Sequence, residues 1–270
     1  MSIKTAPVVA AALLLSTTSQ AAILRVNETE FLAGSGLIEF DEFPAFTTNP
    51  VYTPGDYGGG PGSPTVTFDG WFIGQSLSTD PGADCPGAAA SACVVGTPTG
   101  PLMLDPSSQD TFIRGDGSNP TSPVLSGTPD FNGPIAVLFD TDVVGVGFDG
   151  GFFNDIASTA ITAISRDGTI LGSVENEGLG IEFLGLVTAD GIESIAGVFL
   201  DLVGAESAGF AIDNLRFAGA GEVVAPTPPP PPGPPTPPPP TPVPEPSALA
   251  LVGTGLAVLG LARRRRRGAP

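Results

Sequence analysis

Residues 158–175 read STAITAISRDGTILGSVE, and this stretch decides the predicted fold. Its side chains alternate between two faces, with Ile161 and Ala163 on one face and Thr162 on the other. Such alternation is typical of a β-strand that buries one face. Asp167-Gly168 interrupts the pattern, and Asp-Gly is a strong signal for a two-residue type I′ turn. We therefore predict an antiparallel hairpin of strands 158–166 and 169–175.

Short apolar runs of the same kind recur on both sides of this hairpin, separated by Gly, Pro, Asp and Asn. The further candidate strands are 35–41, 64–73, 110–114, 134–140, 143–149, 181–187, 192–202 and 208–218. A second hairpin is expected between 134–140 and 143–149, turning at Thr141-Asp142. We find no regular repeat of about 20–50 residues, which a solenoid would need. The sequence therefore predicts an all-β fold, a two-sheet, jelly-roll-like β-sandwich over residues 22–220.

Charge and composition exclude several functions. The chain has 270 residues, a net charge of −18 and no histidine. Residues 22–243 contain four arginines and 27 acidic residues, which gives this part a net charge of −23. Because such a body repels phosphate backbones, we expect no nucleic-acid partner. Without histidine there is no Ser-His-Asp triad and no His-ligated zinc, and without lysine in the body there is no Walker-type phosphate loop.

The N-terminus has the pattern of a secretory signal peptide over residues 1–21. Lys4 supplies a positive charge, Val8 to Leu15 form a short apolar run, and Ser19-Gln20-Ala21 is a small-residue cleavage site. The alternative, a membrane anchor, would need a longer apolar run. In an exported chain the two cysteines, Cys85 and Cys93, are expected to form a disulfide that closes a small loop.

The C-terminus consists of successive segments with different compositions. Residues 221–242 are a linker that is almost all proline from 226 onward, which predicts a semi-rigid polyproline II spacer. The tetrapeptide Val243, Pro244, Glu245 and Pro246 follows, and then an uncharged stretch and five arginines at 263–267. As a short hydrophobic helix, residues 247–262 would reach only about 24 Å, less than a roughly 30 Å hydrocarbon core. We expect a transient, marginal anchor in the inner membrane with its basic end in the cytoplasm.

This tail resembles the PEP-CTERM sorting signal of Gram-negative bacteria, in which the Pro-Glu-Pro motif, an apolar helix and an arginine cluster follow one another over residues 243–270. The resemblance implies that an exosortase is a partner and removes the tail. It also implies an inner-membrane intermediate, a final place at the cell surface or in the extracellular matrix, and an association with exopolysaccharide and biofilm.

A second resemblance concerns the ends of the predicted sandwich. Residues 209–217, GFAIDNLRF, are similar to the closing strand of exported carbohydrate-binding jelly rolls, and residues 38–42 look like their first strand. In such families the two strands pair and an Asp helps to hold a structural calcium. The resemblance makes Asp213 the matching ligand, with Asp41 and Glu42 as candidates beside the opening strand.

Two interpretations of these acids stay open. Calcium takes six to eight oxygen ligands, and Asp149, Asn154 and Asp155 form a second candidate cluster. Alternatively, Asp213 makes a simple Asx hydrogen bond to the backbone. We expect that the chain requires no cofactor. A structural calcium ion is the one bound group that the sequence leaves open.

The long loops 42–62 and 76–130 are where a sandwich usually carries recognition. Tyr52 and Tyr57 lie in the first of them and are our candidates for an exposed glycan contact. Trp71 lies in a strand pattern and is expected in the core rather than on a glycan platform.

The leading hypothesis is a non-enzymatic matrix or envelope component that binds polysaccharide, since no catalytic motif marks the chain. One rival is a glycan-cleaving enzyme, because glycoside hydrolysis needs only two carboxylates. Another is a structural spacer without a ligand. A cleft with paired carboxylates and exposed aromatic rings would favour the enzyme.

Overall fold

A computed structural model describes residues 22–117, 123–207 and 209–226. The chain divides into two compact units, Met1–Pro228 and Pro229–Pro270, and the described residues belong to the first. The predicted signal peptide, the linker from 227 to 242, the sorting motif and the helix 247–262 lie outside the described residues. Within the described part, no helix is long and apolar enough to cross a membrane.

The described unit is built from β-strands with short helical turns. The strands are β1 (Ile23–Val26), β2 (Gly36–Ile38), β3 (Val51–Tyr52), β4 (Val66–Asp69), β5 (Gln75–Leu77), β6 (Val94–Gly96), β7 (Thr111–Arg114), β8 (Val124–Gly127), β9 (Ile135–Val143), β10 (Gly145–Phe153), β11 (Thr159–Ile164), β12 (Ile170–Glu175), β13 (Gly180–Thr188), β14 (Ile195–Leu202) and β15 (Ala211–Ala218). The helical turns are α1 (Pro81–Asp84), η1 (Glu28–Glu30) and η2 (Ala90–Ala92).

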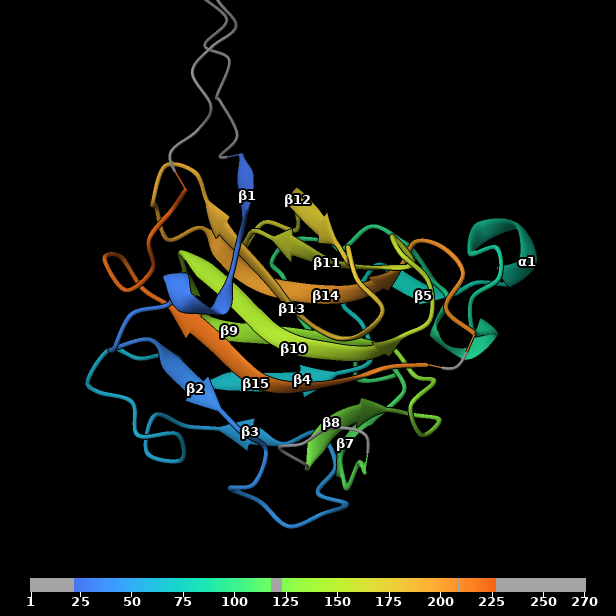
Figure 1. The fold of residues 1–270 in the computed structure, drawn as a ribbon, viewed down its shortest axis with the longest axis horizontal. Helices are drawn as coiled ribbons and strands as arrows, with labels where there is room; N and C mark the ends of the chain where they lie inside the picture. Colours follow the sequence, from blue (N-terminus) through green and yellow to red (C-terminus); the bar gives the residue numbers. More distant parts are fainter. Residues whose placement is uncertain (1–21, 118–122, 208, 227–270) are drawn as a thin grey trace, which may run out of the picture. The chain divides into compact units, whose positions relative to one another are not determined.

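Apart from β5 and β6, which pair with each other, these strands form two large antiparallel sheets that pack as a sandwich. One sheet has the order β1-β13-β10-β15-β8-β7, with β2 also paired to β15, and the other has the order β12-β11-β14-β9-β4-β3. Figure 1 shows the two sheets one over the other. Side chains from both inner faces, among them Phe68, Phe148 and Leu200, fill the core between them. The predicted two-sheet sandwich is therefore confirmed, and the layout is compatible with a jelly roll.

The hairpin predicted over residues 158–175 is present, but its turn is not of type I′. β11 pairs with β12, and Ile161 lies opposite Val174. Gly168 has a φ of +84°, whereas Asp167 is not among the residues with positive φ. A type I′ turn needs positive φ at both central residues. The connection is instead a type I turn closed by Gly168 N–H donating to Ser165 O, followed by a glycine bulge.

The second predicted hairpin, between 134–140 and 143–149, is wrong. β9 pairs with β14 and β4, whereas β10 pairs with β13 and β15 in the opposite sheet. The chain changes sheets at one residue, because Val143 O accepts from Ser194 N in one layer and Val144 N donates to Ala218 O in the other. Thr141-Asp142 lies within β9 and makes no turn.

The ends of the body differ in detail from the prediction. β2 pairs with β15, with Ile38 opposite Leu215, so the opening and closing stretches meet as the jelly-roll resemblance implied. The body, however, continues beyond residue 220: Leu32 N donates to Glu222 O, and Val223 bridges Phe31. The boundary at 221 was placed too early because these residues lack a strand pattern of their own.

Candidate functional site

The predicted disulfide is confirmed. Cys85 and Cys93 are bonded, with their Cα atoms 5.9 Å apart. The loop that they close is fixed on two sides, because Ala89 N donates to Glu206 O and Ser91 Oγ donates to Asn132 O. It therefore supports the structure at one end of the sandwich.

The prediction that Tyr52 is an exposed glycan contact is wrong, whereas the second predicted contact, Tyr57, is partly exposed. Tyr52 is fully buried, and its ring lies 5.9 Å from that of Phe68 and 4.8 Å from that of Phe43. Burial raises the pKa of its hydroxyl, as expected for a phenol kept from water. Tyr57 is half-buried, since its ring packs edge-on against Phe217 and its hydroxyl donates to Pro64 O. Burial also raises the pKa of Tyr57 to about 12. Both rings complete the core because their loop folds back on it.

The two candidate calcium ligands, Asp213 and Asp41, lie in different environments. Asp213 is fully buried, whereas Asp41 is exposed. Asp213 Oδ1 accepts from Asn214 N at 2.7 Å, the local hydrogen bond that was the alternative interpretation. Asp149 lies opposite Asp213 in the sheet and accepts from Asn214 Nδ2, and burial raises the pKa of Asp149. Among the described residues no three His, Cys, Asp or Glu side chains are grouped so that they could hold a metal ion.

The second candidate cluster is also divided between separate networks. Asp149 contacts Asn214, whereas Asn154 N donates to the buried carboxylate of Glu206 at 2.8 Å. Asp155 offers its backbone carbonyl to Asn176, and its carboxylate accepts from the next amide, that of Ile156. Asp149 therefore bonds across the sheet, whereas Asn154 and Asp155 belong to the turn after β10.

The loop 42–62 does present an aromatic ring, but it is Phe46. This ring is 67% exposed, and its backbone has a φ of +70°, a rare conformation for a bulky residue. The Arg114 guanidinium carbon lies 5.4 Å from the ring centroid, and Arg114 Nε lies 2.9 Å from Asp130 Oδ2. We call Phe46, Arg114 and Asp130 the loop surface.

Backbone hydrogen bonds fix the loop surface to the edge of β7. Phe46 N donates to Ile113 O at 2.7 Å, and Asn49 N donates to Thr111 O at 2.9 Å. Asn49 Oδ1 accepts from Thr111 N in return. Rigid support of this kind holds Phe46 in its strained conformation, and such strain tends to be retained where a side chain has a functional position. Sequence reasoning missed Phe46 because only its place outside the strand patterns distinguishes it from the core phenylalanines.

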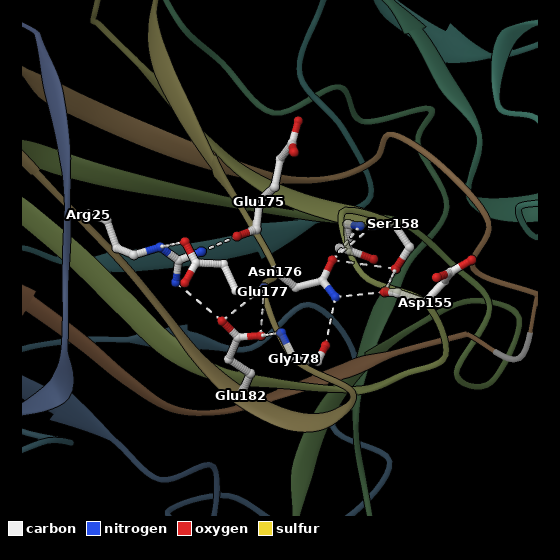
Figure 2. Close-up of polar contacts among 9 residues, drawn as sticks. Arg25, Asp155, Ser158, Glu175, Asn176, Glu177, Gly178 and Glu182 are labelled. Atoms are coloured by element: carbon white, nitrogen blue, oxygen red, sulfur yellow. Dashed lines mark hydrogen bonds and ion pairs between the residues drawn. The ribbon is translucent and has the colours of Figure 1, made fainter.

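A buried amide joins two turns at another place on the sandwich (Figure 2). Asn176 is 1% exposed. Its Oδ1 accepts from Ser158 N at 2.9 Å and Thr159 N at 3.0 Å, while its Nδ2 donates to Asp155 O at 2.7 Å and Gly178 O at 2.9 Å. The side chain thus accepts two hydrogen bonds and donates two, and these bonds hold the β10–β11 and β12–β13 connections together.

A charged cluster continues this network toward β1 (Figure 2). Glu182 accepts from Gly178 N at 2.7 Å and from Glu177 N, and it pairs with Arg25 Nη1 at 3.2 Å. Arg25 also lies 3.4 Å from Glu177 Oε1 and donates to Glu175 O. An open pocket of about 460 Å³ adjoins this cluster and is lined by Ile23, Arg25, Ile156, Ala157 and residues 173–177.

A second pocket, of about 240 Å³, is lined by three carboxylates, those of Asp142, Glu193 and Glu222, and Asp142 is paired with Arg166. Glu193 Oε1 accepts from Ala220 N at 3.0 Å, and Glu222 Oε2 accepts from Gly219 N at 2.8 Å. Both oxygens lie within 3.4 Å of the position that a Cβ on Gly219 would take. Phe217 also lines this pocket but is 2% exposed. The pocket therefore has paired acids without an exposed aromatic wall.

The described body is thus an acidic, disulfide-bonded β-sandwich. Residues 242–267 match the family model of the PEP-CTERM protein-sorting motif. The match confirms the predicted signal around Pro244, Glu245 and Pro246, and it makes the chain an exosortase substrate that is exported and sorted to the cell envelope. Comparison with curated proteins found no match to the chain.

Proposed function

We propose that the exported domain is a non-enzymatic module that binds extracellular polysaccharide through the loop surface, as a component of the matrix or biofilm. The observation that carries this proposal is the exposed ring of Phe46 beside the Arg114–Asp130 pair. An aromatic face packs against the C–H face of a sugar ring, while charged groups at its edge can hydrogen-bond to hydroxyl groups. The sorting signal places such a surface outside the cytoplasm, where exopolysaccharide is found.

The net charge of the body limits the class of polysaccharide that can bind. Residues 22–243 have a net charge of −23, so an acidic polysaccharide would be repelled. Arg114 is partly neutralised by Asp130, and it offers hydrogen bonds without a strong net positive charge. A neutral polysaccharide therefore fits the loop surface best. The proposed route is export, a transient inner-membrane stage through residues 247–262, and release to the surface or matrix.

The test is binding of the purified exported protein to the neutral fraction of the host's own extracellular polysaccharide. We expect Phe46→Ala to weaken binding about tenfold, equivalent to about 1.4 kcal/mol and within the range of aromatic contacts. Phe152→Ala is the matched control, since Phe152 is 56% exposed in β10, away from the loop 42–62, and it should leave the affinity unchanged. Equal losses in both variants, or no loss in either, would reject the loop surface as the site.

One observation favours the rival enzyme: Glu193 and Glu222 line the same pocket and, unlike the third acid there, Asp142, are not paired with Arg166. Glycoside hydrolysis needs such a pair. Both acids, however, already accept from backbone amides, and the pocket's aromatic side chain is buried. We therefore expect the protein to release no new reducing ends from the polysaccharide that it binds. Release that is lost in Glu193→Gln and Glu222→Gln would establish the enzyme instead.

A further inference from the structure

Four large apolar side chains are exposed on and beside the two turns that Asn176 joins. Phe152 lies near the end of β10 and Ile156 in the turn after it, while Leu179 and Ile181 flank the start of β13; their exposed fractions are 56%, 58%, 64% and 37%. β10 and β13 meet here, because Phe153 pairs with Gly180. The Phe152 ring lies 3.5 Å from the position that a Cβ on Gly180 would take. We call these four residues the turn surface.

The turn surface is held in place before any partner arrives. Asn176 fixes both turns from beneath through its four hydrogen bonds. Glu206, which is fully buried, binds Asn154 N and Ser158 Oγ and fixes the first turn again. Since little ordering is needed on binding, exposed apolar area on such turns can contribute to affinity. Contiguous exposed apolar side chains with a polar rim are also typical of interaction sites.

Acidic groups border this apolar surface. Asp155 and Glu177 are exposed beside it, and the open pocket that Ile156 shares with Ile23 is also lined by Glu175 and Glu177. The only cation lining this pocket is Arg25, and it is already paired with Glu177 and Glu182. The pocket therefore combines an apolar wall with excess negative charge.

This charge excludes several occupants. A second copy would bring an identical acidic rim against the first, and an anionic lipid surface would meet the same repulsion. A basic segment would instead be complementary in charge. A lysine or arginine side chain has an apolar stem and a cationic end, as the pocket requires.

We propose that the turn surface docks a polypeptide segment in which a basic side chain is flanked by apolar residues. The apolar residues lie on Phe152 and Leu179. The basic side chain enters the pocket, with its stem against Ile23 and Ile156 and its charge near Glu175 and Glu177. This site is independent of the loop surface, and a partner protein of the envelope or matrix would supply the segment.

The test uses the full exported protein and two synthetic peptides of equal length, one of leucine and lysine and the other of leucine and glutamate. The lysine peptide should bind, and its affinity should fall as salt is raised. Leu179→Ser should weaken its binding at least fivefold, and Glu177→Gln about threefold with a smaller salt dependence. Ile192→Ser is the matched control, because Ile192 is 60% exposed elsewhere, and it should have no effect.

Three outcomes would overturn the proposal. The first is equal binding of the glutamate peptide, which would remove the role of the acidic rim. The second is a loss in Ile192→Ser as large as that in Leu179→Ser, which would make the binding non-specific. The third is a dimer in sedimentation that Leu179→Ser dissociates, which would make the turn surface a self-interface. Phe46→Ala should not affect peptide binding, so this proposal can fail while polysaccharide binding stands.

Discussion

The loop surface and the turn surface each present an exposed phenylalanine, yet they are built and surrounded differently. Phe46 is held by backbone hydrogen bonds to the edge of β7, and its neighbours are a guanidinium and a carboxylate. Phe152 lies near the end of β10, beside turns that a buried side-chain amide joins, among aliphatic residues with an acidic border. The groups around an exposed aromatic ring, rather than the ring itself, therefore decide which class of ligand it can bind.

The largest effect is expected from removing the side chain that supports the turn surface. Asn176→Ala should destabilise the domain by about 4 kcal/mol, because it leaves several buried amides and carbonyls without partners at roughly 1–3 kcal/mol each. Urea denaturation measures this loss. In the folded fraction of the variant, peptide binding at the turn surface should fall, while polysaccharide binding at Phe46 should persist.

Asn132→Ala is the matched control for this variant. The Asn132 side chain donates one long bond, to Asp130 O at 3.3 Å, so its removal should cost less than about 1 kcal/mol. If both asparagine variants are equally stable, Asn176 does not support the turns in the way described. If Asn176→Ala weakens both surfaces equally, the two surfaces are not independent.

Local patterns were sufficient to predict much of the fold. The alternation in 158–175 predicted β11 and β12, and each predicted strand range overlaps a strand of the structure. The five missed strands, β1, β3, β5, β6 and β8, are only two to four residues long, so no period could be recognised in them. The sheet change at Val144 was missed because it depends on partners such as Ala218, which are distant in sequence.

The sites were harder to predict for the same reason. For loop 42–62 the sequence favoured Tyr52 and Tyr57 as exposed rings, but the most exposed ring is that of Phe46, whereas Tyr52 completes the core. No local pattern separates the two, since burial follows from how the loop folds back. Asn176 reads as an ordinary turn residue, and its partner Ser158 lies 18 positions away. The sorting motif, which is contiguous, could be read from the sequence alone.

A smaller effect is expected at Asp201, where a substitution should change stability but not binding. Asp201 lies in β14 on the same face as Phe199, and burial raises its pKa to about 6. Since this pKa exceeds the unfolded value of 3.8, the contribution of Asp201 to the free energy of unfolding is fully present at low pH. This contribution is lost as pH rises from about 4 through 6. Asp201→Asn should therefore stabilise the domain by about 2 kcal/mol at pH 8 and by little at pH 4.

Thermal denaturation at the two pH values measures this difference. Asp167→Asn is the control with the opposite sign, because hydrogen bonds from Ser165 and Thr169 lower the pKa of Asp167. Asp201 belongs to neither surface, so its substitution should leave both affinities unchanged at pH 8. A stabilisation that is equal at pH 4 and pH 8 would contradict the raised pKa.

The smallest expected effect concerns Arg114, the group that most clearly distinguishes the loop surface. Its ion pair with Asp130 is partly exposed, so Arg114→Gln should change stability by less than about 1 kcal/mol. Polysaccharide affinity should fall about threefold, because Gln offers fewer hydrogen-bond donors than the planar guanidinium. Arg114→Lys retains the charge but loses the fork of donors, so it should resemble Arg114→Gln if hydroxyl groups are the ligand. Wild-type affinity in Arg114→Lys alone would instead mean that charge is what the ligand recognises, and the ligand would then be an anionic polysaccharide.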